Sequence, residues 1–514
     1  MLAATKILRG TPLFGRMFGI DQNDGLEEIN SWPNLMIVTS FVWLAVAGLI
    51  GLSMPLIQRF ELGSDFYYLA LTAHGAALAF PFGFQLMVGV GLHRNGGCSG
   101  KAVTGILPAL IYIFMNVGSA LLTVAILMGF SVSLVVMYPL PVVGVETGQW
   151  SYSSLVLGFT GIGLVLIMMI LLYPIQVLKM SFFGKERDDL TLNKRTLDDP
   201  GMLGMVVAAL VLLVFGMPLL IVASYVLVSL YGIIPFEAIT FFLEPVIFQF
   251  AFFVFAHNLM EAMAIMVISA VYGTLPLYLA DGTRELYSKK LANLAIWILL
   301  ITSFSSFLHH FITLFPNMPS ALAYHGHIMS WGTGIGSALS IFTILATIWK
   351  HGLRMNPGVL TVLMGFVLYV LDGSSAIVTS NVAWSFQLHG TMWQSGHTMT
   401  VLISMSMLWM GVLYHHYPVM TGRKLDDTLG YWWVGLFTVG AAGAALVMLA
   451  GGAAGMPRRH ADWAQDGWMI YGDWTLFFGF VMAAGLFVYA LNLFKSRWID
   501  DTAFSPSAQP GPAE

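Results

Sequence analysis

The chain has little charge. Only 9% of its 514 residues are Asp, Glu, Lys or Arg, whereas 58% are hydrophobic. Soluble proteins carry about 25% charged residues, so this composition excludes a soluble globular protein and indicates a polytopic membrane protein. Cysteine is nearly absent as well: the single Cys98 excludes an internal disulfide, a metal cluster held by several cysteines and a CxxCH site for covalent haem attachment.

The ends of the sequence differ from the rest in composition. Residues 1–33 lack the basic, apolar and cleavage-site segments of a secretory signal peptide, so we predict a cytoplasmic leader. Residues 498–514 are rich in Pro, Ala and Ser and are predicted to be a disordered tail. Residues 34–497 contain neither an internal repeat nor a soluble domain. We predict that they form one catalytic membrane domain. Membrane lipid is a predicted partner, and nucleic acid is not.

About twelve stretches are long and apolar enough to span a membrane, which takes about 20 residues. They lie at residues 34–58, 66–93, 104–130, 152–178, 202–231, 245–273, 291–314, 320–349, 356–380, 386–418, 430–453 and 468–494. The predicted fold is therefore an all-α membrane protein with about twelve transmembrane helices in one bundle.

Basic residues are distributed unevenly between the predicted loops. Cytoplasmic loops carry an excess of Lys and Arg. With the N-terminus in the cytoplasm, all of the 22 basic residues except Arg59, Arg458 and Arg459 fall on that side. We therefore predict a multi-pass protein of a bacterial or archaeal plasma membrane with both termini cytoplasmic. The adjacent pair Arg458–Arg459 runs against this bias and indicates an anion-binding site on the outer side.

A few ionisable side chains lie inside the predicted spans, where they are usually functional because placing them in lipid is costly. His257 is followed four residues later by Glu261, and His309 and His310 come near the end of another span. Imidazole suits Fe, Cu and Zn, and a carboxylate shifts the preference toward iron. Because residues four apart share a helix face, we predict a buried metal, iron rather than copper, bound by these four side chains.

Two more histidines, His74 and His397, lie alone in other spans, where axial haem ligands would lie. At about 1.5 Å per residue, they share one depth in the outer half of the membrane with the three histidines above. A lone His can instead hydrogen-bond between helices, a His pair can cap a helix, and Glu261 can be a buried protonated acid. None of these alternatives explains the shared depth. Solvated roles are predicted for the histidines near span ends, His325, His327, His415 and His416.

Six motifs carry these residues. They are LTAHG around His74, LEPVIFQFAFFVFAHNLME from Leu243 to Glu261, FLHHF around His309 and His310, LHGTMWQSGHTM from Leu388 to Met399, YPVMTGR from Tyr417 to Arg423, and GMPRRHADW from Gly455 to Trp463. Together they resemble the catalytic subunit of the haem-copper oxygen and nitric oxide reductases over nearly the whole chain. The resemblance implies a haem-copper oxidase-type bundle with two haems, predicted to be b-type, and one non-haem metal.

The resemblance also implies a role for each motif residue. His397 would be the proximal ligand of the high-spin haem, and His257, His309 and His310 would bind the non-haem metal that faces it. Arg458 and Arg459 resemble the pair beside the haem propionates, and His389 resembles a residue near a propionate.

The low-spin haem departs from the family pattern. His74 resembles one of its axial ligands, but the position two residues after the proximal ligand, normally His, holds Met399. Either His74 and Met399 both bind this haem or it has lost a ligand, since Met399 is one of 31 methionines. We predict ligation, which would raise the haem potential.

A second departure concerns the reaction. The oxygen reductases of the family carry a tyrosine four residues after the first metal-binding His or six residues before the His pair; here those positions hold Glu261 and Ser303. A glutamate at the first position is the pattern of the nitric oxide reductases. We therefore predict a nitric oxide reductase on an oxidase-like scaffold, with Glu261 as a catalytic residue beside the three metal-binding histidines.

Two alternatives remain. One is a terminal oxygen reductase, a cytochrome c or quinol oxidase with an atypical active site that lacks the usual tyrosine. The other is a transporter or haem carrier. A transporter would show broken helices and inverted repeats, and the sequence indicates neither; a haem carrier needs no His pair facing the haem. For either reductase, electrons must come from a partner subunit, from soluble cytochrome or from quinol, with a subunit carrying copper or cytochrome c predicted, and the substrate is NO or O₂.

Overall fold

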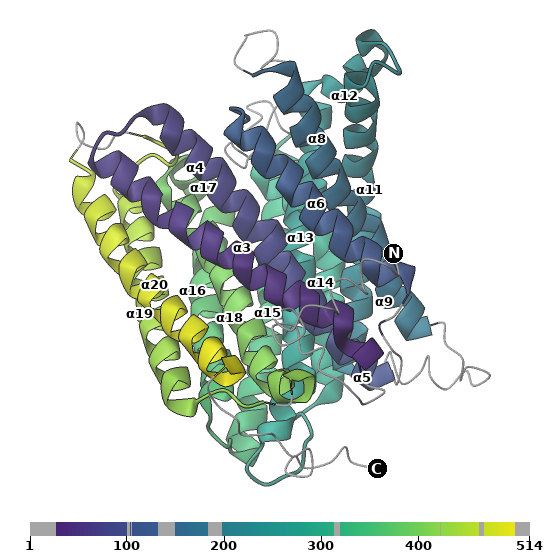
Figure 1. Ribbon diagram of the computed structural model, residues 1–514, viewed down its shortest axis with the longest axis vertical. Coiled ribbons are helices and arrows are strands. Elements are labelled where there is room, and N and C mark those ends of the chain that lie inside the picture. Colours follow the sequence, from purple (N-terminus) through teal and green to yellow (C-terminus); the bar gives the residue numbers. More distant parts are fainter. Residues whose placement is uncertain are drawn as a thin grey trace.

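The computed structural model describes residues 27–99, 103, 105–131, 150–182, 198–312, 319–421, 423–461 and 467–498. The described chain is almost entirely helical (Figure 1), which confirms the all-α prediction. The first of the described helices begins at Glu27, inside the predicted leader. The rest of that leader, and the tail apart from Trp498, lie outside the described residues.

The described helices follow one another along the chain. They are α3 (Glu27–Arg59), α4 (Ser64–Ala77), η1 (Leu78–Phe84), α5 (Gln85–Ser99), α6 (Ile106–Leu127), α8 (Tyr152–Ile167), η2 (Met168–Leu172), α9 (Tyr173–Phe182), α11 (Pro200–Leu230), η3 (Phe236–Ile239), α12 (Thr240–Leu243), α13 (Pro245–Thr274), η4 (Leu275–Tyr278), α14 (Lys289–Ser303), η5 (Ser306–Phe311), α15 (Ser320–His351), α16 (Pro357–Ser380), α17 (Val382–Leu388), α18 (Met392–Thr421), α19 (Asp427–Ala453) and α20 (Met469–Trp498).

Eleven helical segments of the described chain are long and apolar enough to cross a membrane, which confirms the prediction of a multi-pass membrane protein. The remaining predicted span, the seventh at residues 291–314, is interrupted. Its α-helix α14 ends at Ser303, and after Phe304 and Ser305 the chain continues as the short 3₁₀ helix η5. The sequence indicated no broken helix, and this expectation is wrong for the seventh predicted span.

Side-chain caps mark where several helices begin. The Oγ of Ser288 accepts a hydrogen bond from the backbone N–H of Leu291 at the start of α14. Asn356 does the same for Val359 at the start of α16. Each cap satisfies a backbone donor that has no partner within its own helix, so these polar residues fix where the apolar helices start.

Span two contains a wide turn. Between α4 and α5 the chain forms the π-helical segment η1, which contains the buried Pro81. Proline has no backbone N–H and its ring displaces the carbonyl one turn earlier, so it disrupts α-helical hydrogen bonding. A π-helical segment also occurs at η2, between α8 and α9.

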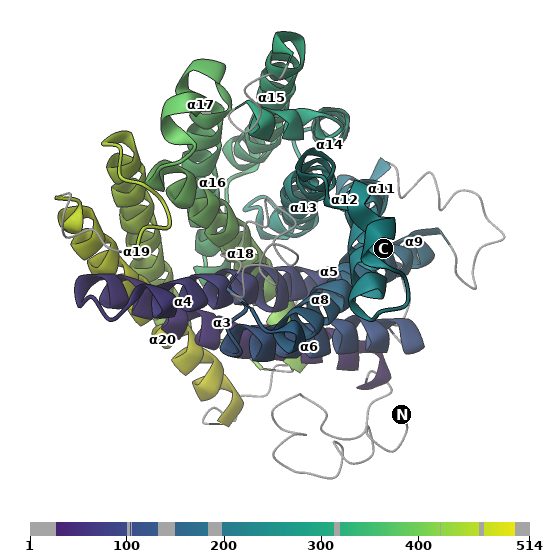
Figure 2. The same cartoon turned by 90° about the horizontal axis from the view of Figure 1, so that it is seen from above.

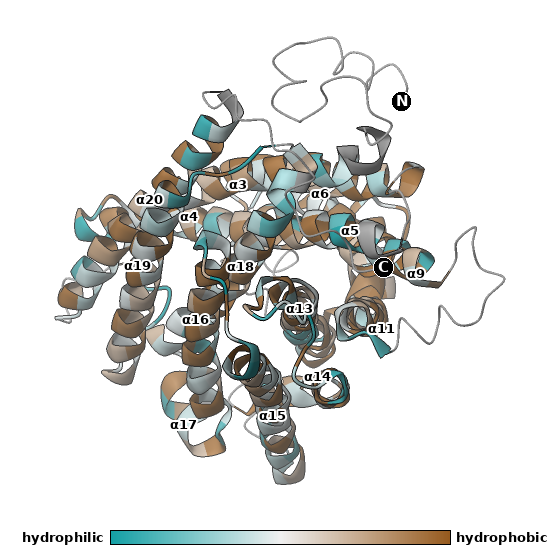
Figure 3. Cartoon of the chain, turned by 90° about the horizontal axis from the view of Figure 1, so that it is seen from below, coloured by the Kyte–Doolittle hydropathy of each residue, from teal (hydrophilic) through white to brown (hydrophobic). Residues whose placement is uncertain are grey.

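Three spans form the interior of the bundle. Seen from above, α13, α18 and α5 lie inside the other helices (Figure 2). The apolar windows of span two and α13 are each 78% buried and that of α18 is 72% buried, against 17% for α20. Viewed from below, polar residues gather at helix ends and in loops while the helices are mainly apolar (Figure 3). Three of the predicted ligands, His257 on α13 and His397 and Met399 on α18, lie in these well-buried helices.

One basic residue does not lie where the loop analysis predicts it. Arg94, expected in a cytoplasmic loop, lies within α5, is 4% exposed and donates a hydrogen bond to the backbone oxygen of Gly201 at 2.9 Å. A guanidinium can be buried in the bundle with this partner, because the carbonyl oxygen replaces part of the hydration that the guanidinium loses.

Candidate metal centre and haem cavity

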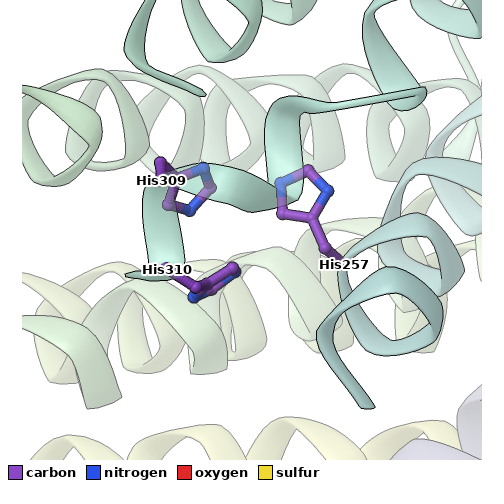
Figure 4. Close-up of side chains that lie close together, drawn as sticks. All are labelled: His257, His309 and His310. Carbon is purple, nitrogen blue, oxygen red and sulfur yellow. The ribbon is translucent and has the colours of Figure 1, made fainter. Parts of the chain in front are cut away.

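Three histidines from two elements converge on one point (Figure 4). His257 comes from α13, and His309 and His310 come from η5. One ligand atom from each ring lies within 4.8 Å of the others, which is the geometry of a metal site. We call these residues the metal triad. The interruption of span seven is what allows two neighbouring histidines to approach α13 together.

Neighbouring groups fix the rings of the metal triad. His309 donates from Nδ1 to the backbone oxygen of Ser306 at 2.8 Å, which leaves its Nε2 free for a metal. The ring of His310 stacks on Phe253, with 4.5 Å between ring centroids and 20° between the planes. His257 Nδ1 lies 3.3 Å from the hydroxyl of Ser306. Metal-binding histidines usually have such partners, which hold the ring in its binding orientation.

A glycine lets η5 approach its neighbour. A Cβ at Gly326 on α15 would lie 2.6 Å from the backbone nitrogen of His309. Only glycine fits at such a distance without a shift of backbone. Gly326 therefore helps to determine how deep the two η5 histidines sit.

Glu261 lies one helical turn beyond His257 on α13 and is 7% exposed. It lines the same cavity as the metal triad, and its carboxyl interacts with Thr333. Among the described residues, the group that can hold a metal contains no carboxylate. Glu261, one helical turn from His257 on the same face, therefore stays a predicted oxygen ligand or acid beside the metal. Three imidazoles alone suit copper as well as iron.

A tyrosine that the sequence reasoning missed lies near Glu261. Tyr369 on α16 lines the cavity, is 7% exposed and has its hydroxyl 3.1 Å from that of Ser337 on α15. Its sequence position matches neither tyrosine position considered above. The available signal was a polar aromatic residue inside a predicted span.

Hydroxyl side chains follow one face of α15 from the metal triad toward the end of that helix. Their spacing of three or four residues places them on one side. Three of them are fully buried. They are Ser330, Thr333, Ser337, Ser340, Thr343 and Thr347. Thr333 donates to Thr302 at 3.0 Å, and Thr347 accepts from the backbone N–H of Tyr287 at 2.9 Å.

One connected cavity of about 920 Å³ holds all the predicted cofactor ligands. The residues that line it include the metal triad and the remaining candidates. These are His74, His389, His397, Met399, Arg458 and Arg459. The structure thus brings together side chains that are spread over about 380 residues of sequence, as their shared depth predicts.

His74 is prepared as a ligand in a similar way to His309. Its Nδ1 donates to the backbone oxygen of Ala47 on α3 at 2.8 Å, so its Nε2 is free. A Cβ at Gly51, also on α3, would lie 2.5 Å from His74 Cε1. The glycine makes room for the ring, and the carbonyl holds it in place.

His397 and Met399 share α18 and both line the cavity. Two positions along an α-helix correspond to a rotation of about 200°, so the two side chains leave the helix in nearly opposite directions. One helix can therefore serve two haem positions, one on each side. The donor set of His74 and Met399 fits a His/Met haem site.

A cationic group forms part of the cavity lining. Arg458 donates from its backbone to the oxygen of Gly390 at 3.1 Å, which ties the arginine loop to the start of α18. Burial and the neighbouring Arg459 lower the pKa of Arg458 to about 10, and burial together with the two arginines lowers the pKa of His389 to about 4. No ion-pair partner of either guanidinium occurs among the described residues. The group therefore fits anionic haem propionates.

A second group of histidines lies where α5 and α18 meet. His93 and His416 have ring centroids 5.2 Å apart, and those of His415 and His416 are 5.0 Å apart. Nδ1 of His415 lies 2.9 Å from the hydroxyl of Tyr278. We call the three histidines the α5–α18 cluster. The prediction that His415 and His416 are solvated is wrong, because both are half-buried and Nε2 of His416 is fully buried.

Comparisons with known proteins agree with this geometry. "Quinol oxidase subunit 1" of Bacillus subtilis (strain 168) is 26% identical over 56% of this chain and 44% of its own length. "Cytochrome c oxidase subunit 1" of Corynebacterium diphtheriae is 26% identical over 49% of this chain and 44% of its own length. The matched part thus spans less than half the length of these relatives.

A solved structure supports the fold. It is described as a heme-copper terminal oxidase dimer determined by cryo-EM, and it superposes with a TM-score of 0.74 and 17% identity over 92% of this chain and 85% of its own. The family model for Cytochrome C and Quinol oxidase polypeptide I matches residues 34–488. Because this match covers most of the chain, the chain belongs to the Cytochrome C and Quinol oxidase polypeptide I family.

Proposed function

We propose that the protein is the catalytic subunit of a membrane nitric oxide reductase, which converts 2 NO, two electrons and two protons to N₂O and H₂O. The observation that carries this proposal is Glu261, a buried carboxyl that faces the cavity of the metal triad where related oxygen reductases carry a tyrosine. NO coupling requires electrons and protons but no radical from the protein. A carboxyl is suited to passing protons and unsuited to supplying an electron.

In this proposal the high-spin haem and the non-haem metal would hold the two NO molecules and supply the electrons. The chain's own residues do the rest. The metal triad orients the metal, the apolar cavity wall excludes water, and Glu261 transfers protons to the substrate oxygen that leaves as water. The hydroxyls along α15 reach Glu261 through Thr333 and are the proposed source of those protons.

Electrons would enter through the haem between His74 and Met399. The chain has one cysteine and no CxxCH motif, so the immediate donor is proposed to be a partner subunit that carries copper or cytochrome c. A His/Met haem has a relatively high potential, and such donors are suited to reducing it.

The second candidate is oxygen reduction. Tyr369 favours it, because this tyrosine lies in the same cavity as Glu261 and could supply the electron and proton for which the family normally uses a tyrosine elsewhere. The names of the relatives also favour it, since both are described as oxidases.

Steady-state NO and O₂ consumption by the purified complex, combined with metal analysis, decides between the two. We expect NO turnover well above O₂ turnover. The variant Tyr369→Phe removes one hydroxyl and sharpens the test: NO turnover is expected to persist in it. Fast O₂ consumption that Tyr369→Phe abolishes would overturn the proposal in favour of oxygen reduction.

A further inference from the structure

A buried carboxylate lies beside the proposed proximal haem ligand. Oδ1 of Asp372 on α16 is 2.8 Å from Nδ1 of His397 on α18. Asp372 is 5% exposed, and its buried Oδ1 accepts no aligned hydrogen bond from the described residues, which leaves the close contact with His397 as the one charged or polar pairing of that atom. A carboxylate inside a membrane protein is costly unless it is paired. The nearest donor is the imidazole, so the two side chains form a pair.

Ser375 determines which nitrogen of His397 carries the proton. Its hydroxyl donates to the backbone oxygen of Asp372 at 2.7 Å and lies 3.2 Å from Nδ1 of His397. Since its hydrogen is already used, the hydroxyl can only accept from the imidazole. The carboxylate can also only accept. Nδ1 must therefore carry the hydrogen, and Nε2 is the nitrogen left free to bind iron.

This arrangement separates His397 from the other proposed ligands. His74 donates to the carbonyl of Ala47, and His309 donates to the carbonyl of Ser306; both acceptors are neutral. Of the described residues proposed to bind a haem or the metal, His397 is the one paired with a carboxylate. A charged acceptor makes a stronger hydrogen bond than a neutral one and raises the basicity of the ligand nitrogen.

We propose that Asp372 is a positioning residue that strengthens His397 as a haem ligand. Its negative charge beside Nδ1–H increases electron donation from Nε2 to the iron, and together with Ser375 it fixes the plane of the ring. The consequence is a stronger iron–histidine bond and a lower potential at the high-spin haem than a neutral partner would give. The inference rests on the proposed role of His397 and requires no change in protonation during turnover.

The test is resonance Raman spectroscopy and redox titration of the purified complex with both haems bound. Asp372→Asn keeps the size of the side chain and removes its charge. The iron–histidine stretching frequency is expected to fall and the potential of the high-spin haem to rise. NO turnover should fall by about tenfold to a hundredfold, as is typical when the partner of a metal ligand is lost. Asp372→Glu retains the charge and should stay near the native frequency.

Two controls separate this inference from the function on which it rests. Ser375→Ala removes the neutral acceptor and should change the frequency less than Asp372→Asn. His397→Ala should abolish the iron–histidine band; a band that persists there would refute the ligand role itself. If His397→Ala loses the band but Asp372→Asn leaves frequency and potential unchanged, the role of Asp372 is overturned while the proposed function stands. If the Asp372→Asn protein does not assemble, Asp372→Glu decides. An iron–histidine stretching frequency equal to that of the unmodified protein supports the proposal, and a frequency lowered to the value expected for a neutral hydrogen-bond partner refutes it.

Discussion

The described part of the bundle contains two groups of three histidines with similar ring spacings, and of the two only the metal triad has the geometry of a metal site. Ring centroids in the metal triad are 4.2, 5.0 and 5.5 Å apart, and two of the distances in the α5–α18 cluster are 5.0 and 5.2 Å. Edge-to-face ring contacts occur in both groups. In the metal triad one ligand nitrogen of each ring converges within 4.8 Å of the others, whereas in the α5–α18 cluster one nitrogen lies against the hydroxyl of Tyr278.

The difference shows that ring proximity does not by itself make a ligand set. A backbone carbonyl, serine hydroxyls and an aromatic ring orient the metal triad, and a broken helix brings two of its members to the third. The α5–α18 cluster lies on two helices, where its rings contact one another and His415 contacts the hydroxyl of Tyr278. A metal centre needs the free nitrogens to point at one position, and second partners provide that direction.

The largest expected effect comes from removing one member of the metal triad. His309→Ala should lose the non-haem metal completely while both haems remain, because two imidazoles do not complete the site. His416→Ala in the α5–α18 cluster is the matched control and should keep the full metal content. Metal analysis and the haem spectrum of both variants measure the outcome. Equal metal loss in the two variants would remove the distinction between the clusters.

Glu261→Gln tests the acid beside the metal triad. The amide keeps the size of the side chain but cannot exchange protons, so NO turnover should fall by more than about tenfold. Metal content should stay unchanged, since Glu261 lies outside the group that converges on the metal. Loss of metal together with activity would instead show that Glu261 is a metal ligand. Unchanged NO turnover would show that Glu261 has no catalytic role.

A smaller effect is expected at α3, where two glycines lie three residues apart. Gly51→Ala places a methyl group 2.5 Å from His74 Cε1, whereas a Cβ at Gly48 meets nothing within 4 Å. The first variant should displace the ring and reduce the low-spin haem content; the second should not. Haem quantification and optical spectra of the two proteins decide this, and identical spectra would argue against His74 as a ligand.

The smallest change is expected from Met399→His. Thioether sulfur stabilises ferrous haem, so replacing it with imidazole should lower the potential of the low-spin haem. The near-infrared charge-transfer band of the oxidised protein should move from the His/Met to the bis-His position. A bis-His spectrum in the unmodified protein would contradict ligation by Met399, as would a single haem per chain.

Much of the fold could be predicted from hydropathy, because the cost of burying polar backbone and side chains dictates long apolar helices. The break at Phe304–Ser305 could not, since hydropathy does not record where the hydrogen-bonding pattern of a helix changes. The metal triad was visible as ionisable groups in apolar runs. Its separation from Glu261 depended on side-chain direction, which residue spacing alone does not determine.

Asp372 and Tyr369 show which signals in the sequence were present but unused. Asp372 is an acidic residue in the middle of a predicted span, so the reasoning that selected Glu261 applied to it equally. Its partner, however, lies 25 positions further along the chain on another helix. Single-sequence patterns relate residues within one helix, and contacts between helices arise only when the bundle is packed.

The π-helical segment η1 has a consequence for how span two tolerates insertions and deletions. A π-helical turn holds more residues than an α-helical turn, and each residue of an α-helix turns its successors by about 100°. Deleting one residue within Leu78–Phe84 would therefore restore an α-helix and leave α5 in nearly the same rotation relative to α4, because the wide turn already holds the extra residue. His74 would keep its place beside α3, and Arg94 would keep its place beside Gly201. The same deletion within α5 itself would rotate the residues beyond it by about 100°, so span two tolerates a one-residue change in length better at η1 than elsewhere.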